Sequence, residues 1–545
     1  MHGRNIRRHE IVCKPQMMHY SSTRANSRES WPFRLLLDSD GWSGDPKAAD
    51  QKKAIEIWSL YSYNLHKATF HGLQKLESRK GKRNFIIGRG SFAGAQRFAG
   101  LWTGDNASTW EFFDISVAQV LALGMAGVSI AGADVGGFEP AHDGESWADP
   151  ELVIRWYCAY SLLPWFRNHY SGKEGKKHFQ EPYAFAELQN SPDWRFVPEK
   201  ERNTYYSVLP ICRYVIQLRY SLLQLLYDAM FENVINGLPI ARAMIITDPL
   251  DSSLYQANQW YTRSQYLVRN DLLVAPNLYK ESQRKTRKLY LPAPDGWYPM
   301  NLRPGTKLYL DGILAQPLTP KVSGGTYVDF DCHISPDEKQ LPYTTPMYIR
   351  EGGIIPQMAV CDWVPDRTRD DKDAPPNPLT INVYPGKDNS YDMYLDDGVS
   401  RESAPDNVYL SALPNDTKGE VVTKLVNAFG DPEAKSIFRH VKFEQTTRRE
   451  FSSDQMRDIR RISVSTPFSQ YGDDLVERAI GREYRVVVWH VSRWPAAEMD
   501  LDAVKVTSEG NIEVRWETDR ALRATVAWVP VSATVNVKMD VSCPA

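Results

Sequence analysis

The sequence predicts a mixed fold in which an α/β region is followed by antiparallel β domains. Two observations carry this prediction. Between residues 97 and 134 the chain has the pattern of a strand, a helix and a second strand, and such units build parallel sheets. Beyond about residue 262, short alternating apolar runs such as DLLVAPNL and YRVVVWHV are separated by Pro and Gly turns, a pattern typical of antiparallel β domains.

Each strand of the first unit ends at an aspartate. The run RFAGLWTG (97–104) precedes Asp105, and the run 128–133 precedes Asp134. The helix between them should begin at residues 108–111 (STWE), a capping box in which the serine hydroxyl and the glutamate carboxylate satisfy neighbouring backbone donors. Catalytic groups of (β/α)8 barrels stand at the carboxyl ends of strands. An aspartate beside glycine is also a common turn residue, so spacing alone leaves both roles open.

Other segments have clear helix or strand signals. Residues 54–76 keep helical spacing, and a second helix should start at Asp149, an N-cap followed by Pro150. We expect short strands at 84–88 and 238–247. A long helix should precede the strand at 238–247 and bury one apolar stripe, formed by Val208, Ile211, Val215, Leu218, Leu222 and Leu225.

Composition excludes several classes of protein. A net charge of −2 over 545 residues provides no electrostatic footprint for nucleic acid or for an anionic membrane. The six cysteines are scattered and form no close-set pair, which favours a reduced compartment. No run of about 18 apolar residues occurs, and the amino terminus has no apolar signal segment. We therefore expect a cytoplasmic protein.

Three blocks carry a family resemblance. Arg89 with residues 92–94 (FAG), then 102–106 (WTGDN), then 132–138 (GADVGGF) occur in the order and at the spacing of glycoside hydrolase family 31. That family contains α-glucosidases, α-xylosidases and α-1,4-glucan lyases. The resemblance covers the chain from about Pro32 to its end.

The resemblance implies a domain plan. After an irregular segment over 1–45, residues 46–262 would form strands 5 to 8 of a (β/α)8 TIM barrel. A proximal β-sandwich over 263–375 and a distal β-sandwich over 376–545 would follow. The charged, proline-rich stretch 364–378 is expected to be a solvated linker.

The resemblance also implies the residue roles. Asp105 would be the general acid/base that protonates the oxygen of the departing sugar. A lone histidine is more often structural, but here the block PWFRNH (164–169) resembles the family segment whose arginine and histidine line the sugar pocket. The expected residues of the terminal-glucose subsite are Arg89, Trp102, Asp134, Arg167 and His169. No metal or organic cofactor is implied, and the expected partner is an α-1,4-glucan or maltooligosaccharide.

The catalytic nucleophile is not found. In the family it lies in a Trp-x-Asp-Met block that should precede Ala54, and nothing there matches. Aligning Pro15 with the proline of the lyase block puts Ile11 at the position of the aspartate. The family's amino-terminal sandwich and first four barrel strands have no counterpart, so we expect a truncated form of a longer enzyme, because half a barrel leaves open edges.

Within the family, the sequence most resembles the fungal α-1,4-glucan lyases. LHKATFHGL, IARAM and YPGKDNSYDMYLDDGVSRESAPD carry this likeness. It implies elimination to 1,5-anhydro-D-fructose through a glycosyl-enzyme. A hydrolytic retaining α-glucosidase and an inactive glucan-binding fragment are the alternatives. The motif Asp396-Asp397-Gly398 is expected to be a turn in the distal sandwich, away from the pocket.

Overall fold

The structure is a computed structural model of the chain. It describes residues 51–141, 147–171, 179–257, 259–301, 320–335, 345–360, 376–396, 438–452, 455–465, 473–490, 504–508, 512–532 and 537–544, with short pieces at 34–36, 304–305, 312–313, 316–317, 398–399 and 468–469. Two compact units are present. One comprises Met1–Lys80 and Asn84–Leu101, the other Gly81–Arg83 and Trp102–Ala545. Ile11, Pro15 and most of the expected linker 364–378 lie outside the described residues.

The first unit is built around one long helix, α3 (Ala54–Gln74). Strand β3 (Ile87–Gly88) pairs in parallel with β4 (Gly100–Trp102), so the predicted helix and strands are present, although both strands are short. Gly88 lies against His66, where an added Cβ would come within 2.0 Å of Nε2. The other elements are β1 (Arg34–Leu36), β2 (Gln51–Lys53), η4 (Glu77–Arg79) and η5 (Ala95–Arg97).

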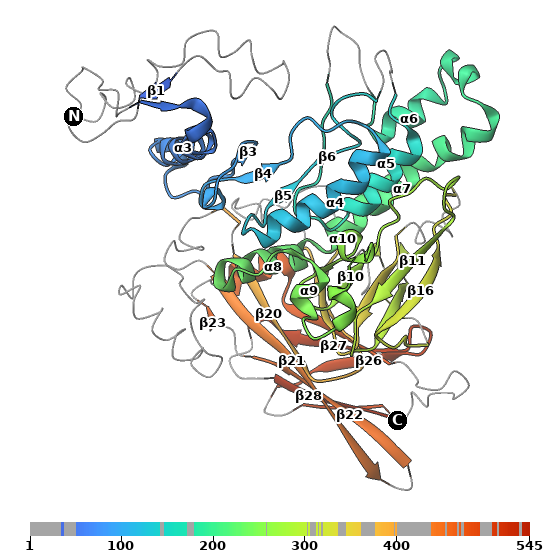
Figure 1. Ribbon diagram of the computed structural model, residues 1–545. Helices are drawn as coiled ribbons and strands as arrows, with labels where there is room; N and C mark the ends of the chain where they lie inside the picture. Colours follow the sequence, from blue (N-terminus) through green and yellow to red (C-terminus); the bar gives the residue numbers. More distant parts are fainter. Residues whose placement is uncertain are drawn as a thin grey trace. The chain divides into compact units, whose positions relative to one another are not determined.

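The second unit begins with alternating short strands and helices (Figure 1). Strands β5 (Ala131–Gly132) and β6 (Asp134–Val135) follow helix α4 (Trp110–Met125). The cap of α4 is Thr109, whose hydroxyl accepts from the Phe112 N–H at 3.2 Å. The capping box expected at the serine one residue earlier is therefore wrong, because Ser108 is buried beneath Gly137 instead.

The cap of the next helix is confirmed. The Asp149 carboxylate accepts from the backbone N–H groups of Glu151 and Leu152 at 2.9 and 3.2 Å, and Pro150 opens α5 (Pro150–Tyr160). Proline costs nothing there, because the first N–H groups of a helix have no partner within it. After α5, strand β7 (Arg167–Asn168) pairs in parallel with β6.

The predicted apolar stripe is buried along two successive helices rather than one. Helix α7 (Arg202–Ser221) ends at Ser221, and α8 (Leu223–Asn236) begins after Leu222, which lies between the two helices. Figure 1 shows α5 and α7 side by side. Three short helices, α6 (Pro182–Leu188), η7 (Pro192–Phe196) and η8 (Glu199–Glu201), precede α7. Among the described residues, no helix is long and apolar enough to span a bilayer.

The strand expected over 238–247 is correct only in part. Strand β8 covers Ala241–Arg242, and the chain turns into helix α9 at Met244–Thr247. The Met244 side chain packs into the apolar core under the following β region, so tertiary packing overrides the β propensity of the segment MIIT. Strand β8 pairs antiparallel with β9 and forms one edge of a six-stranded sheet.

The following region consists of short antiparallel strands, as the turn-rich sequence predicted. The six-stranded sheet has the order β15-β12-β17-β10-β9-β8. The bounds are η9 Ser252–Tyr255, α10 Tyr261–Ser264, β9 Tyr266–Val268, β10 Leu272–Val274, β11 Thr286–Leu291, β12 Trp297–Asn301, β13 Pro304–Gly305, β14 Gly312–Ile313, β15 Gln316–Pro317, β16 Thr326–Asp331 and β17 Met347–Arg350.

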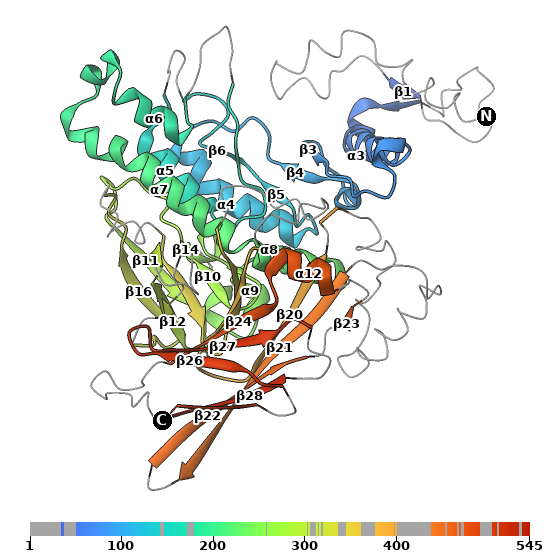
Figure 2. The ribbon, with the colours of Figure 1, turned by 180° about the vertical axis from the view of Figure 1, so that it is seen from behind.

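The carboxyl-terminal region has two sheets, ordered β18-β19-β24-β27-β26 and β20-β21-β22-β28-β25. Figure 2 shows β24, β27 and β26 of the first sheet and β20, β21, β22 and β28 of the second. Neighbouring strands within them pair antiparallel, apart from the parallel pair of β19 with β24. The bounds are β18 Ile354–Met358, β19 Leu379–Val383, β20 Asn389–Asp396, β21 Phe438–Ser452, β22 Gln455–Val464, β23 Phe468–Ser469, α12 Asp473–Ile480, β24 Glu483–Trp489, β25 Lys505–Ser508, β26 Arg515–Asp519, β27 Ala524–Pro530 and β28 Val537–Pro544.

A hydrogen bond links the two ends of the expected turn after β20, Asp396 and Gly398, whereas Asp397 lies outside the described residues. Asp396 also has a second role. The Asp396 carboxylate accepts from the Gly398 N–H at 2.8 Å, which makes an Asx-type turn. Asp396 is buried, and its carboxylate also accepts from the Arg83 guanidinium and from the Tyr227 hydroxyl. The motif therefore joins the end of β20 to α8 and to the segment Gly81–Arg83.

Candidate active site

The centre of the site is a buried carboxylate, one oxygen of which has no hydrogen-bond partner among the described residues. Strands β6 and β7 align Asp134 directly with Arg167, and the Arg167 Nε donates to Asp134 Oδ1 at 2.7 Å. The Asp134 side chain is fully buried, and its Oδ2 has no hydrogen-bond partner among the residues that the structure describes. A buried carboxylate oxygen without a donor is costly, so Oδ2 is suited to accept a hydrogen bond from a bound hydroxyl group.

Two tryptophans flank the arginine. The Arg167 guanidinium carbon lies 5.3 Å from the ring centroid of Trp102, at the end of β4, and 5.2 Å from that of Trp165. Contacts of this kind with aromatic faces limit the movement of a guanidinium group. Trp102 was expected at the site, whereas Trp165 was not. Its only sequence signal is that it lies two residues before Arg167, in the block PWFRNH.

Asp105 and His169 lie near this pair. Both side chains are exposed, and both are close enough to Asp134 to affect its ionisation. Burial is the largest influence and raises the pKa of Asp134, while Arg167 and His169 oppose the rise and the negative charge of Asp105 adds to it. The site thus combines a buried, arginine-paired carboxylate with a second, accessible carboxyl group.

Asn106 ties the loop that carries Asp105 to β6. Its side chain is fully buried, its Nδ2 donates to the Asp134 carbonyl at 2.9 Å, and its Oδ1 accepts from the Asp134 N–H at 3.3 Å. The Asn106 carbonyl also accepts from the Phe138 N–H at 2.6 Å. The block WTGDN therefore places Asp105 beside Asp134 through the asparagine that follows it.

The glycines of the block GADVGGF allow the two loops to approach. Gly137 has φ +90°, and an added Cβ would lie 2.3 Å from the Ser108 Cα. Only glycine combines that backbone conformation with such a contact. Phe138, at the end of the block, then stacks on the His169 ring with centroids 5.0 Å apart. Phe138 belongs to the family block, but its sequence gave no reason to expect its ring at the site.

The structure thus brings together five of the six expected site residues, namely Trp102, Asp105, Asp134, Arg167 and His169. Arg89 belongs to the first unit, where it follows β3 with an exposed side chain. Among the described residues, no three His, Cys, Asp or Glu side chains are grouped to hold a metal ion. Paired carboxylates, an arginine and aromatic faces are suited to binding a neutral polyhydroxylated ligand and to exchanging a proton with it.

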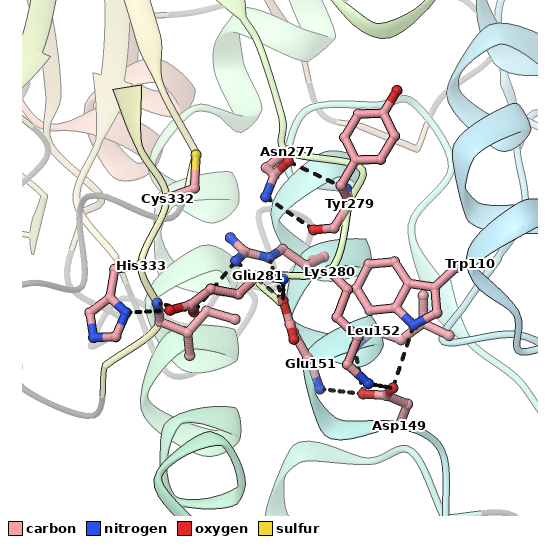
Figure 3. A network of polar contacts seen from close by, with 12 residues as sticks. Trp110, Asp149, Glu151, Leu152, Asn277, Tyr279, Lys280, Glu281, Cys332 and His333 are labelled. Atoms are coloured by element: carbon pink, nitrogen blue, oxygen red, sulfur yellow. Dashed lines mark hydrogen bonds and ion pairs between the residues drawn. The ribbon is translucent and has the colours of Figure 1, made fainter. Parts of the chain in front are cut away.

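A second acidic cluster, at the start of α5, is structural (Figure 3). Burial raises the pKa of Glu151, but its Oε1 accepts from the Glu281 N–H at 2.6 Å and from Arg155. Asp149, the helix cap, also binds the Lys280 ammonium at 3.1 Å. These contacts join α5 to the loop after β10, and they engage Glu151 Oε1 and both oxygens of Asp149.

Two family models match the chain. The glycosyl hydrolases family 31 TIM-barrel domain matches residues 13–229, and the glycosyl hydrolase family 31 C-terminal domain matches residues 237–355. Together they cover more than half of the chain, and both belong to the same family.

Among curated proteins, the chain is 28 % identical over 426 residues to α-glucosidase 2 of Bacillus thermoamyloliquefaciens, which covers 77 % of this chain and 44 % of that protein. It is 34 % identical over 236 residues to the glucosidase 2 α subunit of Saccharomyces cerevisiae, covering 43 % of this chain and 21 % of that protein. The chain therefore spans less than half the length of these relatives.

Solved structures show the same fold. A Flavobacterium johnsoniae GH31 dextranase in complex with glucose has a TM-score of 0.59 at 21 % identity, over 90 % of this chain and 50 % of the dextranase. The Gracilariopsis lemaneiformis α-1,4-glucan lyase has a TM-score of 0.60 at 19 % identity, over 93 % of this chain and 43 % of the lyase. With both family models matched in order, this chain belongs to glycoside hydrolase family 31, a family of enzymes.

Proposed function

We propose that this chain carries the acid/base and sugar-binding part of an α-glucan-cleaving site. The single observation that carries the proposal is the buried Asp134, paired with Arg167 and keeping Oδ2 for a ligand beside the accessible Asp105. The terminal glucose would bind through its hydroxyl groups to Asp134 and Arg167. Trp102 and His169 would supply the aromatic sides of the subsite. The substrate would be an α-1,4-glucan or a maltooligosaccharide.

The proposed reaction begins as in a retaining glycosidase. Asp105 protonates the oxygen of the departing sugar while the bond from that oxygen to C1 breaks and a carboxylate nucleophile bonds to C1. In the lyase reaction the carboxylate of the nucleophile then takes the C2 proton while its bond to C1 breaks, so that a C1–C2 double bond forms and the nucleophile leaves as the carboxylic acid. Tautomerisation of the enol gives 1,5-anhydro-D-fructose. The nucleophile has no candidate in this sequence, so it would come from residues that this chain does not contain.

Elimination is proposed ahead of hydrolysis because the segments LHKATFHGL, IARAM and 384–406 resemble those of the fungal α-1,4-glucan lyases. Hydrolysis is the second candidate, since the curated relatives are named as glucosidases. A glucan-binding fragment without activity is the third, because the Trp-x-Asp-Met block is missing. In the same proposal, residues 46–262 are strands 5 to 8 of the barrel, and 263–375 and 376–545 are two β-sandwich domains.

Product analysis separates these candidates. The purified chain is incubated with maltotetraose, alone and with a polypeptide supplying the amino-terminal half of a family 31 barrel, and products are identified by mass. A sugar one water lighter than glucose supports elimination, and glucose from every residue supports hydrolysis. Asp105→Asn should abolish either product, whereas Asp193→Asn, at an exposed aspartate on η7, should not.

Binding is measured separately from turnover. Trp102 and Trp165 contact Arg167, so maltotetraose should change the tryptophan fluorescence of the chain, and Asp134→Asn should weaken that response. Binding without any product would favour the glucan-binding fragment. No fluorescence response and no product would overturn the proposed site.

A further inference from the structure

We infer that Gln180 is a positioning residue for the sugar site, although its side chain does not belong to the Asp134–Arg167 pair. The inference rests on the proposed function and adds a residue that sets the geometry of the same site. Gln180 lies shortly before α6, and its side chain is fully buried. Its Nε2 donates to the carbonyl of Gly137 at 3.0 Å and to the carbonyl of His169 at 3.0 Å.

These two carbonyls belong to different site loops. Gly137 lies in the loop after β6, directly before Phe138, and His169 lies in the loop after β7. A single amide group therefore holds the two segments that carry the stacked rings of Phe138 and His169. A backbone hydrogen bond from the Ser171 N–H to the Phe138 carbonyl, at 2.8 Å, also joins these loops.

The oxygen of the same amide is also engaged. Gln180 Oε1 accepts from Asn168 Nδ2 at 3.3 Å, and that Nδ2 also donates to the Val135 carbonyl at 3.0 Å. Asn168 is itself oriented by a hydrogen bond from the Tyr157 hydroxyl of α5. The Gln180 amide is thus held at both ends, and its orientation depends on β6, β7 and α5 together.

The loop after β6 is shaped around this side chain. Gly136 has φ +92°, and an added Cβ would lie 2.2 Å from Gln180 Oε1. A larger residue at position 136 would therefore have to displace the Gln180 amide. The close approach also means that the loop would lose a direct neighbour if the Gln180 side chain moved.

Without the two donors, the Gly137 and His169 carbonyls would need other partners. The bond to the Gly137 carbonyl is buried and the bond to the His169 carbonyl is partly buried. Because a buried carbonyl left without a donor is costly, the two loops are expected to move apart until water or another group reaches the Gly137 carbonyl. The Phe138 and His169 rings move with those loops. Gln180 therefore acts on the sugar site through the relative placement of these two rings.

The test replaces Gln180 by methionine, which keeps the chain length but has no N–H donor. The matched control is Gln265→Met in the proximal β region. Gln265 is also fully buried, its Nε2 donates to the Tyr290 carbonyl at 2.7 Å, and its Oε1 accepts from the Tyr290 N–H at 2.9 Å. Both variants lose buried hydrogen bonds from a side-chain amide to the backbone, but only Gln180 lies between the site loops.

Two measurements are made on the full chain. In protein labelled at histidine, the ring Cε1–H resonance of His169 is displaced by the ring current of Phe138, and His169→Asn identifies it. Maltotetraose binding is followed by calorimetry. We expect Gln180→Met to shift the His169 resonance and to weaken maltotetraose binding about tenfold, the effect of losing roughly one net hydrogen bond. Gln265→Met should change neither.

The outcomes distinguish this inference from the proposed function. If the wild-type chain does not bind maltotetraose, the proposed function fails, and the His169 resonance alone decides the role of Gln180. An unchanged resonance in folded Gln180→Met overturns the inference. If Gln180→Met does not fold, Gln180→Glu, which keeps the shape and the acceptor, takes its place. Failure of both variants to fold would make Gln180 a general structural residue and would also overturn the inference.

Discussion

Replacing Arg167 by methionine should destabilise the chain through the charge that remains at Asp134. The Asp134 side chain is fully buried, whereas the Arg167 side chain is 33 % exposed. Methionine retains apolar contact with Trp102 and Trp165 but removes the donor to Asp134 Oδ1. Among the described residues, the carboxylate would then have no side-chain donor at either oxygen.

The size of the effect follows from two interactions of the Arg167 guanidinium group. A hydrogen bond to a charged group contributes about 1.5–3 kcal/mol, and the partial exposure of Arg167 places it toward the lower value. Each arginine–tryptophan interaction adds about 0.5–1 kcal/mol, part of which methionine retains. The expected decrease in the free energy of unfolding is therefore about 2–3 kcal/mol.

The destabilisation should depend on pH, and its sign can be worked out. Burial already raises the pKa of Asp134, and Arg167 opposes that rise, so removing Arg167 raises the pKa further. A carboxyl group with a raised folded-state pKa binds its proton more tightly in the folded protein than in the unfolded chain. Stability is then lost as pH rises from the unfolded value of 3.8 through the folded pKa. Arg167→Met should therefore cost more at neutral pH than in acid.

The assay is urea unfolding followed by tryptophan fluorescence, at about pH 4.5 and about pH 7.5, on either side of the expected change. Arg461→Met is the control, because its Nε lies 2.8 Å from Asp540 Oδ1 in a pair where both side chains are about one-third exposed. Such a pair contributes at most about 1 kcal/mol. If Arg167→Met costs no more than Arg461→Met at either pH, the account of Asp134 as a buried charge is wrong.

Three other changes test the surrounding structure. Burial raises the pKa of Asp228 to about 7, so the free energy of unfolding should decrease as pH rises from about 4 to about 7, by at most roughly 4 kcal/mol. Urea titrations of Asp228→Asn should show a smaller dependence on pH. Gly136→Ala should lower the melting temperature more than Gly237→Ala, because both have positive φ but only the Gly136 Cβ would meet another group; equal decreases would contradict the close approach of Gln180. Asp396→Asn should lower the free energy of unfolding by about 2–4 kcal/mol in chemical denaturation, because the Arg83 guanidinium loses its buried, charged partner. Adding Arg83→Met to that variant should recover part of the lost stability.

Local sequence determined several elements of this protein. The cap at Asp149, the proline after it and the buried leucine stripe need only the residues within one helix, because capping and helical periodicity act over a few positions. The antiparallel β region likewise followed from alternation and turn residues. The family blocks identified Asp105 and the residues expected around it, without giving their geometry.

Tertiary structure decided the chemistry of the site. The pairing of Asp134 with Arg167 spans 33 residues, and among the described residues Oδ2 has no hydrogen-bond partner, because burial removes solvent while the β6–β7 register supplies a donor to Oδ1 alone. The position of Trp165 and the two bonds from Gln180 depend in the same way on which loops meet. Short-range sequence patterns contain no information about contacts between distant loops, because desolvation and hydrogen-bond partners are set by residues far apart in the sequence.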